Sequence, residues 1–173
     1  MTWTLENSKN NESRKVLWEL VPYMRGRCLD IGAGQYKVFP HFVSVDSGHH
    51  WGLRDIDEPV KDAKDLSIFA SCSVDLAYSS HLLEHFPYKD VPAVLDEWLR
   101  ITKQNGHMIL YIPDSEEYPK VGQPGANPDH KWDPTYELVV QALEQSRYSW
   151  DIVDFQKRNK EDEYSLFFVV KRL

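Results

Sequence analysis

The chain has 173 residues, of which 42% are apolar and 27% charged, and this composition fits a globular protein with one continuous core. Its formal net charge is −7, with 27 acidic and 20 basic residues and no long basic run. Nucleic-acid binding requires clustered Lys and Arg, so we expect no nucleic-acid partner. No apolar run approaches the roughly 20 residues that span a bilayer, so we expect no membrane partner either.

The two cysteines favour a reducing compartment. Cys28 and Cys72 each adjoin a predicted buried strand, where a free thiol usually acts as a small apolar side chain. The N-terminus has no charged leader followed by an apolar stretch, which argues against a signal peptide. We therefore expect a cytoplasmic protein that forms a single domain over residues 1–173, with no pattern that indicates its oligomeric state.

The first part of the chain alternates between helical and strand patterns. Apolar residues recur at helical spacing over 12–23. Two runs of successive apolar residues follow, at 28–31 and 42–46, and they predict buried parallel strands. Between these strands the sequence leaves room for only a very short helix within 36–42, interrupted by Pro40.

The second part continues the alternation and then closes with a hairpin. The segment 114–129 is rich in Pro, Gly and acidic residues and predicts a long loop, a feature that is often functional in compact domains. Strands that alternate with helices before an antiparallel pair predict a mixed sheet covered on both faces. The predicted elements are a strand at 74–78, a helix at 88–102, a strand at 107–112, a helix at 134–146, and hairpin strands at 150–155 and 164–170.

A glycine-rich turn follows the first predicted strand. Gly32 and Gly34 lie where a ligand can approach the backbone, because a Cβ would block that approach. Asp46 ends the second strand, and a carboxylate at that position can accept hydrogen bonds from both hydroxyls of a ribose. Ligands of open α/β sheets bind at the carboxyl ends of the strands, where all three residues are expected.

A dinucleotide is one alternative ligand for this turn. Its fingerprint requires a third glycine three residues after the second, and Lys37 occupies that position. Asp30, two residues before Gly32, instead suits a cationic ligand that carries an ammonium and a sulfonium group. A dinucleotide-dependent oxidoreductase is therefore disfavoured.

Five segments in this order and spacing resemble the class I S-adenosylmethionine-dependent methyltransferases, especially the small members in which Leu-Glu-His follows the fourth strand. The resemblance covers roughly residues 12–114. It implies S-adenosyl-L-methionine as the cofactor, and an α/β Rossmann-like three-layer sandwich with a mostly parallel seven-stranded sheet ending in an antiparallel hairpin. The matching segments are Leu29–Gly34, Val43–Asp46, Lys61–Ala63, Val74–His85 and Leu99–Gly106.

The resemblance also implies roles for individual residues. Gly32 and Gly34 would hold the methionine part of the cofactor, and Asp46 would hold its ribose. Asp62 and the Ala63 amide would contact the adenine. The predicted cofactor-binding residues are Asp30, Gly32, Ala33, Gly34, Gln35, Asp46, Ser47, Asp62, Ala63, Ser79 and Ser80.

Two departures from the family's pattern leave an alternative open. Tyr36 stands where the family usually has a third glycine, and the segment 36–42 is short. A protein that binds S-adenosylmethionine or S-adenosylhomocysteine without catalysing transfer would tolerate both departures.

The segment His81-Leu-Leu-Glu-His85 has two interpretations. His-x-x-Glu-His occurs in one class of zinc peptidases, but zinc needs a third protein ligand and no residue has a supporting signature, so we predict no metal. Within the resemblance, Glu84 and His85 would support the turn at the rim of the pocket. His81 would face the methyl acceptor, directly after Ser79 and Ser80, which would line the methyl-donor pocket.

His130 is the second candidate catalytic residue, after His81. It lies in a segment expected to fold over the same edge of the sheet, and a histidine near its usual pKa of ~6.5 can accept a proton from an acceptor hydroxyl. Alternatively, His130 is structural and hydrogen-bonded to a nearby carboxylate such as Asp129.

The acceptor pocket is expected to lie between the N-terminal segment around Trp3 and Trp18, the 114–130 loop and the 81–88 turn, while Trp51 is placed near the adenine. Methyl transfer needs alignment and exclusion of water, and a base only if the nucleophile is protonated. Since we expect no additional domain that would bind a macromolecule, we favour a small-molecule or sugar-like acceptor over a protein side chain.

Overall fold

The computed structural model describes residues 12–49, 56–160 and 162–173. Their strands form one sheet in the order β3-β2-β1-β4-β5-β7-β6, parallel as far as β5, with β7 antiparallel to both β5 and β6. The predicted mostly parallel seven-stranded sheet that ends in an antiparallel hairpin is confirmed. The strands are β1 (Cys28–Ile31), β2 (Val43–Asp46), β3 (Glu58–Pro59), β4 (Val74–Ser80), β5 (Thr102–Pro113), β6 (Trp150–Arg158) and β7 (Ser165–Arg172).

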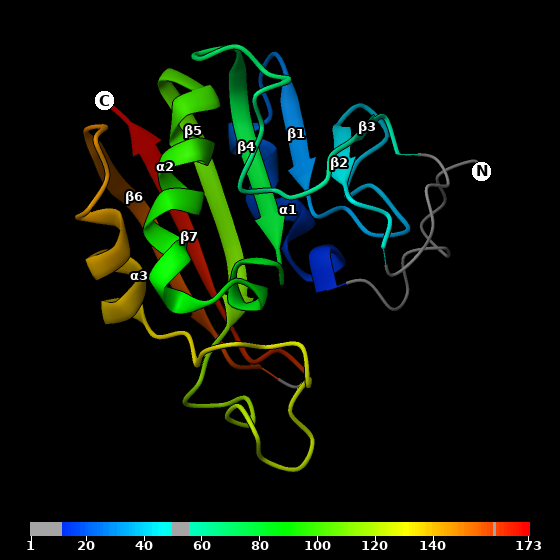
Figure 1. Ribbon diagram of the computed structural model, residues 1–173, viewed down its shortest axis with the longest axis vertical. Helices are drawn as coiled ribbons and strands as arrows, with labels where there is room; N and C mark the ends of the chain where they lie inside the picture. The colour runs from blue at the N-terminus through cyan, green and yellow to red at the C-terminus, as the bar shows by residue number, and fades with distance from the viewer. Residues whose placement is uncertain (1–11, 50–55, 161) are drawn as a thin grey trace.

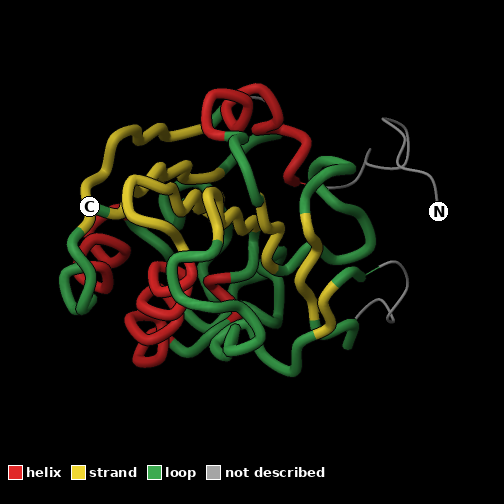
Figure 2. The backbone as a smooth tube through the Cα atoms, turned by 90° about the horizontal axis from the view of Figure 1, so that it is seen from above, coloured by secondary structure: helices red, strands yellow, loops and turns green. Residues whose placement is uncertain are grey.

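Helices cover both faces of this sheet, which gives three layers (Figures 1 and 2). Helices α2 and α3 lie on one face, and α1 with its flanking 3-10 turns lies on the other. The inward stripe of α2, which includes Val94, Leu95 and Trp98, is completely buried, as its helical spacing predicts. The helical elements are η1 (Glu12–Val16), α1 (Leu17–Leu20), η2 (Val21–Tyr23), η3 (Leu83–His85), η4 (Tyr88–Asp90), α2 (Val91–Ile101) and α3 (Tyr136–Leu143).

The connection between β1 and β2 differs from the prediction, because residues 36–42 form turns and contain no helix. Pro40 has no amide hydrogen to donate to a helix, and the Val38 amide donates instead to the buried Asp30 carboxylate at 2.7 Å. Val38 and Phe42 still bury their side chains against the sheet. The helix of 12–23 is also less regular than predicted, since only 17–20 is α-helical.

The remaining boundaries differ from the prediction by a few residues. The fifth strand begins at Thr102, ahead of the predicted start at 107, and Asn105 adopts a positive φ of 62° inside it. Helix α3 begins at Tyr136 because the Thr135 side chain accepts a hydrogen bond from the Leu138 amide and caps the helix. The loop predicted over 114–129 contains no helix or strand.

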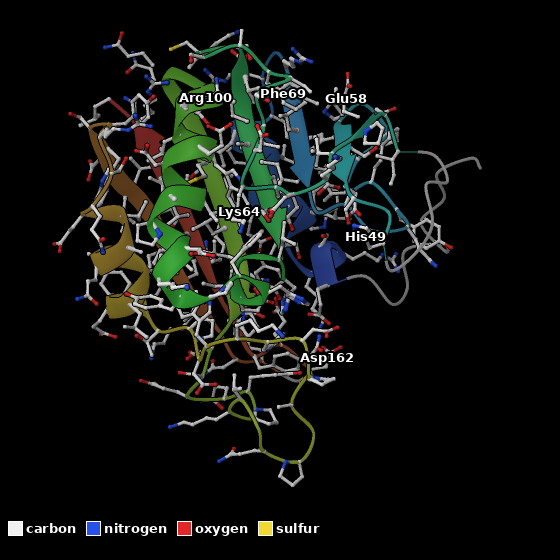
Figure 3. All side chains as sticks on the ribbon, viewed as in Figure 1. His49, Glu58, Lys64, Phe69, Arg100 and Asp162 are labelled. Atoms are coloured by element: carbon white, nitrogen blue, oxygen red, sulfur yellow. The ribbon has the colours of Figure 1, made fainter. Side chains whose placement is uncertain are left out.

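The parallel strands place their carboxyl ends at one edge of the sheet, and the loop that follows β5 extends beyond that edge (Figure 1). Phe69 and Arg100 lie near the opposite edge, whereas Lys64 lies nearer the carboxyl ends (Figure 3). At the opposite edge the Arg100 guanidinium donates to the Phe69 carbonyl at 3.1 Å, which fixes the connection to β4. Among the described residues, no helix is long and apolar enough to cross a membrane.

Candidate active site

A cavity of about 300 Å³ lies at the carboxyl ends of β1 and β2. Four segments separated in the sequence supply its wall: the turn after β1, the end of β2, residues 60–63 and the turn after β4. Seven of the residues predicted for the site line it, namely Gly32, Gly34, Asp46, Ser47, Asp62, Ala63 and His81.

The glycine turn and the tip of β2 are joined by hydrogen bonds. Gly34, with φ +61°, donates its amide to Asp46 Oδ2 at 2.9 Å, and the Gly48 amide donates to Asp46 Oδ1 at 2.7 Å. Two amides use two of the roughly four lone-pair positions of a carboxylate, so Asp46 can accept further hydrogen bonds from a ligand.

Gly32 has two reasons to be glycine. Its φ of +77° lies in the left-handed region, and a Cβ there would lie 2.7 Å from Leu82 Cδ2. Leu82 itself lines the cavity, so a larger residue at position 32 would push this side chain into the ligand space.

Asp30 lies outside the cavity wall and is 2% exposed. Burial, with a smaller contribution from Asp46, raises the pKa of its carboxyl group to about 7, although the hydrogen bond from the Val38 amide opposes this rise. A carboxyl group in this environment gains or loses a proton near neutral pH, so its charge responds to a cationic neighbour.

Four other predicted cofactor residues also lie outside the wall. Ala33 is buried, and Gln35 is exposed. The Ser79 hydroxyl donates to the Ile31 carbonyl at 2.9 Å and joins β4 to β1, while Ser80 is half-buried at the strand end. Their predicted contacts with the cofactor stay predictions.

Helix α2 positions the segment predicted to contact the adenine. The Trp98 indole donates to the Ala63 carbonyl at 2.9 Å. The Asp62 carboxylate accepts from the Lys64 amide at 2.9 Å, which closes a tight turn beside the cavity. The apolar part of the wall, which includes Val60 and Phe86, is not predicted from the sequence, because single apolar residues carry no chemical signature. Their adjacency to predicted site residues is the only signal.

His81 turns sharply out of β4 and lines the cavity. Its φ of 48° is unusual for a residue with a side chain, and its amide continues the ladder by donating to the Tyr111 carbonyl at 2.7 Å. Burial and the neighbouring His130 lower the pKa of His81 to about 3, so its imidazole is neutral at physiological pH. Its Nε2 lies 3.2 Å from the Ser165 hydroxyl.

His130 is 6% exposed and does not line the cavity. The segment that carries it packs on η3, because the Lys131 amide donates to the Glu84 carbonyl at 2.8 Å and the Trp132 indole donates to the Leu83 carbonyl at 3.3 Å. His130 Nε2 lies 3.5 Å from Glu84 Oε1, and the charge of Asp129 also acts on the ring, since it opposes the effect of burial on the pKa of His130. Burial lowers the pKa of His130 and raises that of Glu84 to about 8.

Of the three tryptophans expected near the pocket, the structure describes only Trp18. Trp3 and Trp51 lie outside the described residues. Trp18 is 85% exposed on α1 and does not line the cavity.

Comparison with protein families shows what this site belongs to. Residues 29–110, which include the glycine turn, the end of β2 and the turn after β4, match the model of the family described as "Methyltransferase domain". This match and the fold together support assignment of the chain to the class I S-adenosylmethionine-dependent methyltransferases. S-adenosylmethionine is the cofactor of this family of enzymes. The match also favours methyl transfer over the dinucleotide-dependent alternative.

Solved structures share the fold of this methyltransferase at low sequence identity. A SAM-dependent methyltransferase from Archaeoglobus fulgidus superposes with a TM-score of 0.64 at 15% identity over 97% of each chain. One from Mesorhizobium loti has a TM-score of 0.66 at 16% identity and covers 94% of this chain and 99% of its own. The trans-methyltransferase CalH, in complex with SAH, has a TM-score of 0.58 at 12% identity and covers 93% of this chain and 55% of its own. Among curated protein sequences, none matches this chain.

The cavity of the methyltransferase fits its cofactor. Its volume of about 300 Å³ lies at the lower end of the range for small-molecule sites. Its wall combines two glycines, a strand-end carboxylate with lone pairs beyond the two that the amides use, and apolar side chains, and this chemistry is compatible with an adenosyl group.

Proposed function

We propose that this methyltransferase acts on a small-molecule or sugar-like acceptor. The observation that carries the proposal is the single cavity wall that joins Gly32, Asp46 and His81, because it places predicted cofactor residues beside a predicted catalytic one. A cavity of about 300 Å³ leaves little room beyond the cofactor, which favours a small acceptor. The net charge of −7 argues against a nucleic-acid acceptor.

The chain's own residues would supply binding and alignment. Asp46 would hold the ribose hydroxyls, Gly32 and Gly34 would hold the methionine part, and Asp62 with Ala63 would hold the adenine. Bound S-adenosylmethionine supplies an activated methyl group, so the protein's main task is to align the acceptor with it and exclude water. Apolar wall residues support that exclusion.

Of the two predicted catalytic residues, we propose His81 as the one that meets the acceptor. It lines the cavity as a neutral imidazole, so it can accept a proton from a hydroxyl or an ammonium group, although its low pKa makes it a weak base. His130 faces Glu84 behind the wall, so we assign it a positioning role instead.

The test is a methyl-transfer assay with isotopically labelled S-adenosylmethionine and four acceptor classes: hydroxylated small molecules, sugars, peptides and RNA. We expect labelled product from one of the first two classes, and His81→Asn should lower turnover while S-adenosylhomocysteine affinity stays within about two-fold. Transfer only to peptides or RNA would overturn the proposal. Tight S-adenosylhomocysteine binding with no transfer to any class would support the non-catalytic alternative.

We also propose a cytoplasmic location. Its support is the state of the cysteines: both Cys28, which is buried, and Cys72, which is exposed, are free thiols. Fractionation of cells that produce the protein tests this location.

A further inference from the structure

Two histidines and a glutamate converge beside the cavity. Glu84, His85 and His130 each bring one potential ligand atom to within 4.8 Å of the others. The first two residues belong to η3, and the third comes from the loop after β5. Imidazole nitrogen and carboxylate oxygen are ligands that divalent transition metals accept in proteins.

The carboxylate of Glu84 is the second observation. Its side chain is 0% exposed, and within the described part of the chain neither carboxylate oxygen has a hydrogen-bond partner. His130 Nε2 lies 3.5 Å and His81 Nδ1 lies 3.6 Å from Glu84 Oε1, and neither nitrogen makes a hydrogen bond to it. A buried carboxylate without a partner is costly, and proteins compensate such groups with a paired charge or a metal ion.

We propose that Glu84, His85 and His130 bind one divalent transition-metal ion of the Zn²⁺ type. Two ligand atoms of a tetrahedral zinc site lie about 3.3 Å apart. The 3.5 Å between His130 Nε2 and Glu84 Oε1 is close to that spacing, so an ion requires little movement of these side chains. This proposal does not depend on the proposed function.

Contacts of neighbouring residues hold the loop that carries His130 against η3 without an ion. The amide of Lys131 and the indole of Trp132 donate to the carbonyls of Glu84 and Leu83, which fixes the loop against η3 on the side next to His130. The Tyr118 ring packs against the His130 ring with centroids 5.3 Å apart. A site that is already assembled loses little conformational entropy when the ion binds.

The site borders the space that the acceptor would use. His85 and His81 both line the cavity, so an ion held by His85 lies at the cavity rim. Three protein ligands leave a coordination position open, as in catalytic zinc sites. An oxygen atom of the methyl acceptor could occupy this open position, where the ion would orient and polarise it.

The experiment uses untagged protein treated with a chelator and then dialysed. Calorimetry with Zn²⁺ should show one site per chain, and thermal denaturation should show a higher Tm with Zn²⁺ than with chelator. Glu84→Gln and His130→Asn should each lose about 100-fold or more in Zn²⁺ affinity. His41→Ala removes an exposed histidine outside the cluster, and Cys72→Ser removes the exposed thiol; both should bind like the wild type.

Absence of stoichiometric Zn²⁺ binding by the wild type would overturn the proposal, and would leave Glu84 as a protonated carboxyl beside neutral imidazoles. Equal losses of Zn²⁺ affinity in His41→Ala and His130→Asn would also overturn the proposal, since Zn²⁺ binding would then be adventitious. Glu84→Gln keeps the side-chain shape, and its Tm in chelator checks its folding; His130→Asn is the second variant if it fails to fold. Asp46→Ala should keep Zn²⁺ affinity, which separates this site from cofactor binding.

Discussion

The carboxylate of Asp46 accepts a hydrogen bond of 2.9 Å from the backbone amide of Gly34, and this bond fixes the tip of β2 against the turn that follows β1. The Gly48 amide donates to the other oxygen at 2.7 Å. One side chain therefore shapes the two loops that border the cavity and also offers its remaining lone pairs to a ligand.

Asp46→Ala removes both functions of this carboxylate. We expect S-adenosylhomocysteine affinity to fall by about 10- to 100-fold, because the ligand hydroxyls and the two backbone amides lose their acceptor. Each buried polar group left without a partner costs about 1–3 kcal/mol. Calorimetry on the folded variant measures the loss. Asp151→Ala is the matched control, since Asp151 is exposed on β6 at the other end of the sheet. Unchanged affinity in Asp46→Ala would remove this residue from the ribose site.

Gly32→Ala and Gly122→Ala form a matched pair. Both glycines have a positive φ, +77° and +83°, so each alanine adds similar strain of roughly 1–2 kcal/mol. A Cβ at position 122 meets no atom within 4 Å, whereas one at position 32 displaces Leu82 towards the cavity. Both variants should therefore lower the Tm, but only Gly32→Ala should weaken S-adenosylhomocysteine binding. Equal affinities in the two variants would contradict the role of Gly32 as a backbone contact.

Asp30→Asn tests the buried carboxyl group through pH. Burial raises the pKa of Asp30 from 3.8 to about 7, so between these values the folded protein holds a proton that the unfolded chain has lost. Its stabilising contribution is present below about pH 4 and is lost as the pH rises through about 7. Asparagine does not titrate, so the free energy of unfolding of the variant, relative to the wild type, should increase from about pH 4 to about pH 8. Urea unfolding across this range measures the difference, and a constant difference would place Asp30 in a polar environment.

Asp96→Ala tests a contact remote from the cavity. The Asp96 carboxylate on α2 accepts hydrogen bonds from the Ser146 hydroxyl and the Arg147 amide, both at 2.9 Å, and from Arg147 Nε at 2.7 Å. Its loss leaves these donors unpaired, and we expect unfolding free energy to fall by about 2 kcal/mol. Arg147→Ala should cost less than about 1 kcal/mol because this side chain is 75% exposed. Urea denaturation measures the unfolding free energy of both variants. A larger loss of stability in Arg147→Ala than in Asp96→Ala would contradict the role of Asp96 as the shared acceptor.

The sequence predicts those strands and helices that a local pattern of apolar residues, glycine and proline determines. β1 and β2 are short apolar runs next to glycine and aspartate, and both lie where predicted. β3 has two residues, too few for any periodicity, so the sequence does not locate it. Asn105 and Gly106 predict a turn, but β5 continues through them because Thr102 and His107, on either side of a register shift, both pair with β4.

The site residues also divide into those that a local sequence pattern predicts and those that only tertiary packing brings together. Gly32, Asp46 and Asp62 follow strand ends in a recognisable order, and the structure places all three on one cavity wall. The proximity of His130 to Glu84 is different, because it depends on the packing of Lys131 and Trp132 against η3. No spacing in the sequence encodes that contact, which is why a third metal ligand was not expected.

The turns of 36–42 have a consequence for the order in which this protein folds. Because no helix lies between β1 and β2, Val16 and Leu20 cover that face of the sheet, with Tyr78 and Phe167 beneath them. The helical segment that carries them is anchored to the C-terminal hairpin, where Arg158 donates to the Lys15 carbonyl across a sequence separation of 143. In a nascent chain this layer therefore cannot close until the residues up to Arg158 have been synthesised, and contacts of such long range form slowly.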